Sequence, residues 1–283
     1  MIKTLLLIPL LALQFQSVDK AFQRGNDYPA CEQTLLEMLP KAENAQEKAS
    51  VLWRLARVSY MIGDAQTDKM ARRERFTKGI EYAEQGCRAN PRDALCLMWH
   101  CANVGRECQT HPMMEQAAAV PKMTEDLTRI LNQLDPHMSE AWQALSEIYY
   151  YHPLKSKESG INYARAAALN APKDEPRLIT YIYLASRLYE RNMSASKRAS
   201  LAAEHSAKLA KLSGASNIDR YAYTDAMKQA LPWTEKSIGE LSDREEARLI
   251  LDYAERRYKS FSEPAKAERD EYKNLLKLKQ QWK

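Results

Sequence analysis

Apolar residues along this chain recur at offsets of three, four and seven positions. Three phrases show the pattern in register: they start at Trp53, Trp142 and Ile182, and each has Ala or Leu three positions later and Tyr seven positions later. These offsets place the side chains on one stripe of an α-helix. Because apolar and polar residues nowhere alternate over a useful length, strands are not expected. The pattern predicts an all-α protein built on a repeated helix.

Proline stops separate the predicted helices. Pro91, Pro136 and Pro172 each follow one helical stretch and precede the next. Proline cannot continue a helix and biases the residue before it away from helical geometry, so the chain changes direction at these points. The predicted helices span residues 18–24, 29–40, 46–62, 68–89, 94–107, 115–134, 139–151, 157–170, 175–190, 194–212, 219–230, 242–259 and 263–281.

The repeated helix resembles the first helix of the tetratricopeptide repeat, whose pattern is Trp-x2-Leu-Gly-x2-Tyr. The phrase from Trp142 to Tyr149 follows this pattern with serine at the glycine position, and the phrase from Trp53 places Arg57 there. The resemblance covers roughly residues 18–212. It implies antiparallel helix pairs, with long inserted turns, stacked in a right-handed superhelix and closed by a C-terminal helical cap.

The spacing of the repeat markers points to a narrower group. Trp53 and Trp142 are further apart than two standard repeats of about 34 residues allow, and the excess falls in the turns inside two helix pairs. The narrower resemblance rests on VLWRLAR at residues 51–57, a long insertion, GIEYAE at residues 79–84 and the stop at Pro91. This combination is similar to the regulator of microtubule dynamics family and its bacterial relatives. A weaker likeness is to the helical-repeat lipoprotein that accompanies some TRAP transporters.

The first residues resemble an export signal. Lys3 supplies a positive charge, Leu5 to Leu13 form a short apolar run, and polar residues follow. The run is too short to span a bilayer, which needs about 20 apolar residues. We therefore expect an exported, periplasmic protein, with anchoring by an uncleaved N-terminus as the alternative; the cleavage position stays open. The predicted organisation is a signal peptide or N-terminal anchor over 1–17, a TPR-like helical-repeat domain over 18–232 and capping helices over 233–283.

An exported protein could pair some of its five cysteines. Cys87 and Cys96 flank the turn at Pro91 between two antiparallel helices, which makes them the pair closest to bridging distance, and the other pairings stay open. The alternative is that most of the thiols are small buried apolar groups. The cysteines are Cys31, Cys87, Cys96, Cys101 and Cys108.

Charge and motifs argue against nucleic-acid binding and catalysis. The formal net charge of +5 comes from 42 Lys and Arg against 37 Asp and Glu, spread along the chain without a nucleic-acid-binding module. Nucleotide-binding loops, HExxH, CxxC and GxSxG are absent from the sequence. His100 and Cys101 are neighbours and point about 100° apart on a helix, so we do not expect them to share an ion with Cys108. Neither catalytic residues, a cofactor nor a metal site is predicted.

The first helix of each pair lines the inner wall of a stacked repeat array. We call Trp53, Trp142 and Ile182, which begin the three phrases, the lead residues. Residues one and five positions after each lead residue should face this wall, and so should Tyr150, which lies about one helical turn beyond the second of these positions on its helix. Their forked donors and amphipathic rings suit peptide carboxylates or small anionic ligands, although any amphipathic helix exposes such residues. The predicted contact residues are Arg54, Val58, Gln143, Glu147, Tyr150, Tyr183 and Arg187.

These observations predict a non-enzymatic binding protein that presents a concave groove to a protein or peptide partner in the cell envelope. The alternative is an accessory or receptor component that holds a small, partly apolar ligand in a pocket closed by the inserted segments. No nucleic acid is expected as a partner. Membrane contact is expected only through an uncleaved N-terminus, if at all.

Overall fold

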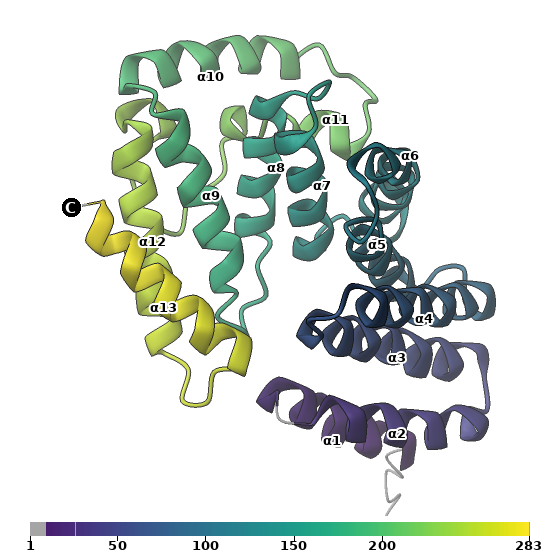
Figure 1. Cartoon of the computed structure of the whole chain (residues 1–283). Helices are drawn as coiled ribbons and strands as arrows, with labels where there is room; N and C mark the ends of the chain where they lie inside the picture. The colour runs from purple at the N-terminus through teal and green to yellow at the C-terminus, as the bar shows by residue number, and fades with distance from the viewer. Residues whose placement is uncertain (1–9, 26, 283) are drawn as a thin grey trace, which may run out of the picture. The chain divides into compact units, whose positions relative to one another are not determined.

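The computed structural model describes residues 10–25 and 27–282, with residues 10–13 and 113–116 described by backbone alone. These residues form helices joined by turns, and the one β-type pairing among them is an isolated bridge between Leu231 and Thr234 (Figure 1). The predicted all-α class is confirmed. The α-helices are α1 (Leu10–Arg24), α2 (Tyr28–Met38), α3 (Ala45–Ala65), α4 (Lys69–Ala89), α5 (Ala94–Cys108), α6 (Met113–Arg129), α7 (Ser139–Tyr151), α8 (Lys157–Leu169), α9 (Leu178–Arg191), α10 (Ala195–Leu209), α11 (Asn217–Tyr221), α12 (Asp243–Lys259) and α13 (Lys266–Gln281).

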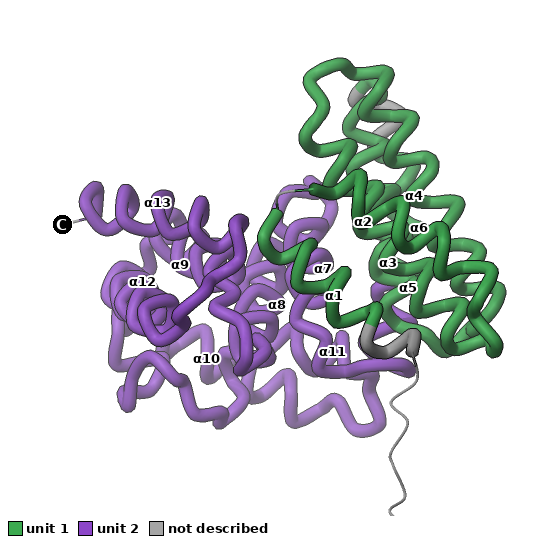
Figure 2. The backbone as a smooth tube through the Cα atoms, turned by 90° about the horizontal axis from the view of Figure 1, so that it is seen from below, with its two compact units in different colours: residues 1–126 green, residues 127–283 purple. Residues whose placement is uncertain are grey.

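The chain divides into two compact units, residues 1–126 and residues 127–283 (Figure 2). Consecutive helices pack in pairs within each unit, most extensively α3 with α4 and α7 with α8. Helix pairing is what the repeat pattern predicts. The superhelix and the boundary between a repeat domain and capping helices at 232/233 stay predictions.

The core of the amino-terminal unit lies where α1 and α2 meet α3. Leu35 of α2 and Leu55 of α3 are fully buried, and Val18 brings α1 into the same cluster. Trp53, the first lead residue of the repeat, is also buried and packs beside Cys96 of α5. The apolar stripe read from the sequence is therefore the surface along which these helices pack.

Capping side chains and a glycine determine where helices of this unit begin and how closely two of them pack. The side chains of Asn44, Asp68 and Asp93 each accept a hydrogen bond from a backbone N–H in the first turn of α3, α4 and α5, respectively. Such caps stabilise a helix start by about 1 kcal/mol each. Close packing of α4 on α5 requires Gly79, because a Cβ atom there would lie 2.2 Å from Oδ1 of Asn103. These features fix where the helices begin and how closely they approach.

The carboxy-terminal unit is built around the second lead tryptophan. Trp142 of α7 is fully buried and stacks on Tyr163 of α8 and Tyr221 of α11, with ring centroids 5.5 and 4.7 Å apart. Gly160 allows α8 to approach α7, since a Cβ atom there would lie 2.8 Å from the backbone N of Tyr150. This tryptophan is therefore wedged between adjoining helices.

The helices of residues 233–283 complete the core of the same unit. Ile250 of α12 and Leu275 of α13 are fully buried in one cluster with Leu184 of α9. The indole of Trp282 stacks on Tyr189 of α9, with ring centroids 4.1 Å apart. Both C-terminal helices therefore cover α9, the helix that carries the third repeat phrase.

Three structural details differ from the sequence predictions. The first helix extends from Leu10 rather than residue 18, so the predicted boundary at 17/18 lies inside α1. Residues 219–230 do not form one helix: α11 is followed by a 3-10 turn at Thr224–Ala226 and by irregular chain. The candidate bridge between Cys87 and Cys96 is not formed, and no disulfide joins any of the five cysteines, all of which are described. Within the described residues, no helix is both long and apolar enough to cross a bilayer.

Candidate functional site

Five of the seven predicted contact residues come together on neighbouring helices of the carboxy-terminal unit. Helix periodicity puts Gln143, Glu147 and Tyr150 on one side of α7, and the same spacing puts Tyr183 and Arg187 on one side of α9. We call this surface the α7–α9 wall. Its residues are joined to one another by hydrogen bonds and ring contacts, which the sequence alone does not show.

Arg187 is the centre of the wall. Its guanidinium donates hydrogen bonds to Oγ of Ser146 and to a carboxylate oxygen of Glu147. It also lies 4.8 Å from the ring centroid of Tyr150 and 5.6 Å from that of Tyr183. The arginine is only 3% exposed. Because its donors already have partners inside the protein, Arg187 positions the wall and does not serve as a receptor for an external anion.

Two more hydrogen bonds join α7 to α9. Oγ1 of Thr180 donates to Oε1 of Gln143 at 2.7 Å, and the phenol of Tyr150 donates to Oε2 of Glu190 at 2.6 Å. Burial, followed by the neighbouring Glu190 carboxylate, raises the pKa of Tyr150, so this phenol keeps its proton. The wall is thus held in one arrangement before any partner arrives.

Two carboxylates lie near enough to the half-buried Tyr183 to act on its phenol. Burial raises the pKa of Glu147 despite the opposing effect of Arg187. Burial also raises the pKa of Glu271, on α13. After burial itself, these two carboxylates are the main causes of the raised pKa of Tyr183. A raised carboxyl pKa means that the negative charge is incompletely compensated, so this part of the wall favours a cation.

The end of α7 adds exposed apolar surface beside the wall. Tyr151 is 72% exposed and Leu154 is 88% exposed. Of the preceding tyrosines, Tyr150 is buried in the wall and Tyr149 packs edge-on against Tyr163, with centroids 5.0 Å apart. Of the three consecutive tyrosines, Tyr149 therefore packs in the core, Tyr150 in the wall and Tyr151 faces solvent.

The two predicted contact residues of the amino-terminal unit have other surroundings. Arg54 pairs with Asp19 of α1 at 2.8 Å and lies over the rings of Phe15 and Trp53, at 4.2 and 4.1 Å. Val58 is fully buried in the core that α1 covers, so the prediction that it faces a partner is wrong. In the structure, α1 packs on this part of α3.

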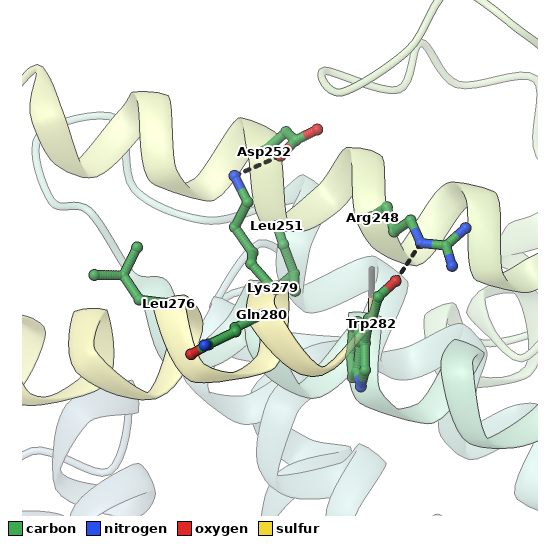
Figure 3. A pocket seen from close by; sticks show the side chains of 7 residues that line it. All are labelled: Arg248, Leu251, Asp252, Leu276, Lys279, Gln280 and Trp282. Carbon is green, nitrogen blue, oxygen red and sulfur yellow. Dashed lines mark hydrogen bonds and ion pairs between the residues drawn. The ribbon is translucent and has the colours of Figure 1, made fainter.

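A separate cavity of about 450 Å³ lies between α12 and α13 (Figure 3). Apolar side chains of Leu251, Leu276 and Trp282 line it, with Arg248 at one end. Arg248 Nε donates to the backbone carbonyl of Trp282 at 2.8 Å, and Lys279 pairs with Asp252 at 2.6 Å. The volume falls in the range of small-molecule sites, about 300–1,000 Å³. The lining comes from the C-terminal helices and not from the inserted segments that the sequence analysis had considered.

One group of metal-ligand types comes together among the described residues: His100, Cys101 and Asp126. The sequence places Cys108 on the same helix as His100 and Cys101, whereas Asp126, the residue that joins them in the structure, lies on the next helix. No local sequence signal identifies it.

Comparison with known proteins concerns the first part of the chain. Residues 14–152 match the model of a family described as regulator of microtubule dynamics protein 1-3. The match takes in the region from α1 to the end of α7, while α8 to α13 lie outside it. No curated protein matches the chain at a significant level of sequence similarity.

Proposed function

We propose, on the premise that residues 14–152 belong to the regulator of microtubule dynamics family, that this chain is a non-enzymatic helical-repeat binding protein. Its α7–α9 wall receives a segment of a protein or peptide partner that carries a basic side chain. The observation that supports this most directly is Tyr183, whose pKa is raised by burial and then by the nearby carboxylates Glu147 and Glu271, which are themselves partly buried.

The energetics of the carboxylates explain the preference for a base. A half-buried carboxylate has lost part of its hydration, and a partner lysine or arginine replaces that hydration with a charge-assisted hydrogen bond. The ring of Tyr183 adds a cation–π contact, which contributes about 1 kcal/mol in a partly desolvated site. Arg187 holds Glu147 in place, so little side-chain entropy is lost when the partner binds.

We place this binding in the cell envelope. The basic, apolar and polar order of the first seventeen residues supports export. An uncleaved N-terminus would keep the chain at the membrane.

Binding of short peptides to the full chain tests the proposal. Peptides of equal length with Lys and Arg, with Gln, or with Asp and Glu are compared by fluorescence anisotropy. We expect the basic peptides to bind, more weakly as salt rises, and at least about tenfold more weakly to Glu271→Gln. Glu204→Gln is the control, because Glu204 lies on α10 with its side chain 59% exposed. Equal binding of acidic peptides, or equal losses in both variants, would contradict the proposal.

The cavity between α12 and α13 favours a second candidate, a small, partly apolar ligand. Leu276 and Trp282 offer apolar contact and Arg248 offers a positive charge, which together suit an amphiphilic carboxylate. Titration with a medium-chain fatty acid should change the fluorescence of Trp282 and raise the melting temperature. Leu276→Gln should abolish both effects. If the titration leaves the wild-type chain unchanged, the second candidate is rejected.

A further inference from the structure

We propose that His100, Cys101 and Asp126 bind a single Zn²⁺ ion between α5 and α6 of the amino-terminal unit. One ligand atom from each residue lies within 4.8 Å of the other two. Three atoms this close share a point within about 2.8 Å of each, and zinc is bound at about 2.0–2.3 Å by these ligand types. Shifts of about half an ångström would therefore complete the coordination.

The two ring nitrogens of His100 have different surroundings, as in many zinc sites. Nδ1 lies 3.2 Å from Oδ2 of Asp126, on the side of the candidate site. Nε2 points the other way, 4.0 Å from Oε1 of Glu84 on α4. A histidine that binds a metal commonly donates its other N–H to a carboxylate, which fixes the ring and increases its basicity. Glu84, at 4.0 Å, would have to move closer by about 1 Å to accept this hydrogen bond.

Asp126 is also oriented by a second partner. Nζ of Lys122, one turn earlier on α6, lies 2.9 Å from Oδ1 of Asp126. This contact leaves Oδ2, the oxygen nearest His100, directed at the site. Ligating carboxylates are usually held by such hydrogen bonds.

Cys101 is the ligand whose chemistry an ion changes most. Its side chain is buried, and its Sγ lies 3.8 Å from the carbonyl oxygen of Met123 on α6. A thiol carries a proton until a metal ion binds it as the thiolate. Zinc displaces that proton to solvent and binds the thiolate. Thiolate and carboxylate then neutralise the ion, and a water can take the fourth tetrahedral position.

The neighbouring positions of His100 and Cys101 do not prevent shared binding. Their Cα–Cβ bonds diverge by about 100° around α5. The imidazole is long enough to turn towards α6, however, where Asp126 lies, while the short thiol already faces that helix. An ion here would join α5 to α6 and so stabilise the last helix pair of this unit.

Cobalt titration of the full chain, after treatment with a chelator, tests the proposal. Co²⁺ replaces Zn²⁺ in such sites and reports a bound thiolate through its charge-transfer absorption. We expect one Co²⁺ per chain, displacement by Zn²⁺ and release of a proton. Cys101→Ser should abolish the thiolate band, and Glu84→Gln should weaken affinity by about tenfold. The matched control is Cys96→Ser, a buried cysteine on the same helix.

The wild-type titration tests the proposal even where a variant fails to fold. Absence of a thiolate band in the wild-type chain, or a band that persists in a folded Cys101→Ser variant, would overturn the proposal. A band lost only in Cys96→Ser would overturn it equally. Because α7 and α9 carry none of the ligands, peptide binding to the α7–α9 wall is measured separately from this result.

Discussion

Replacing Glu246 by Gln should destabilise the carboxy-terminal unit strongly. Glu246 is fully buried on α12 and accepts hydrogen bonds from Arg165 of α8, Arg198 of α10 and Nε1 of Trp233, the last at 3.0 Å. Both arginines are about 1% exposed. Asp243, also fully buried, is the other carboxylate in contact with Arg198. Glu246 thus contacts both buried cations, and Asp243 shares one of them.

The magnitude follows from two independent routes. Removing one partner of a buried ion pair costs about 3–5 kcal/mol, because the other charge stays buried. Burial by itself would raise the pKa of Glu246, but Arg165 and Arg198 outweigh it and lower the pKa from 4.5 to about 2. At 1.36 kcal/mol per unit, that shift contributes about 3 kcal/mol at neutral pH. Both routes lead to a loss of about 3 kcal/mol.

The sign of the pH dependence is fixed by the lowered pKa. Below the usual carboxyl pKa, Glu246 is protonated in the unfolded chain but still ionised in the folded chain. The free energy of unfolding therefore falls as the pH falls from about 5 to about 2. Urea unfolding, followed by circular dichroism and tryptophan fluorescence, is measured across this range. Glu246→Gln should be less stable at pH 7 and should lack this part of the acid dependence. Glu204→Gln, on the exposed face of α10, should lose far less.

A loss below about 1 kcal/mol in Glu246→Gln would refute this reasoning, because it would mean that the arginines find other partners. An unchanged acid dependence would refute it as well. In that case Glu246 would not be the group whose protonation destabilises the unit.

Two further substitutions test how the helices approach each other. Gly160→Ala should destabilise the carboxy-terminal unit by about 1–2 kcal/mol in thermal unfolding, since its Cβ would meet the backbone of Tyr150. The control Gly105→Ala should be close to neutral, because its Cβ meets only the flexible side chain of Met123. Equal losses of stability in the two variants would contradict this packing. Asp19→Asn removes the carboxylate that pairs with two arginines of α3, so amide hydrogen exchange in α1 should become faster while α3 stays protected. Unchanged exchange in α1 would show that these ion pairs do not hold α1 against α3.

Local sequence signals predicted most of the helices because their ends are set locally. The predicted helix 139–151 coincides with α7, which lies between Pro136 and Pro153. The predicted helix 94–107 matches α5, which begins after the capping side chain of Asp93. Where a proline or a capping side chain decides the boundary, the neighbouring residues are sufficient.

Long-range contacts explain the helices that were predicted wrongly. The amide side chain of Asn162 on α8 donates to the carbonyl of Ala222, and its oxygen accepts from the N–H of Asp225. These contacts hold the segment after α11 in an irregular path. The start of α9 is similar: the N–H of Leu178 donates to the carboxylate of Glu268 on α13, 90 residues later. No local pattern encodes such partners.

In the candidate sites, too, local sequence patterns do not reveal partners that lie far away along the chain. Periodicity placed the predicted contact residues on one side each of α7 and α9, and the forked donors of Arg187 suggested that it would be open to an anion. Its donors instead bind Ser146 and Glu147. Glu271 and Asp126 belong to helices without a repeat marker, so only the folded chain brings them to their sites.

Site-specific photocrosslinking tests the central claim, that the α7–α9 wall is the working surface, most directly. A photoreactive phenylalanine analogue replaces Tyr183 in the full chain, expressed in cells, and in a second chain it replaces the exposed Lys197 of α10. The account predicts one protein adduct from position 183, crosslinked through a basic segment, and none from position 197. No adduct at 183, or the same adducts from both positions, would contradict it.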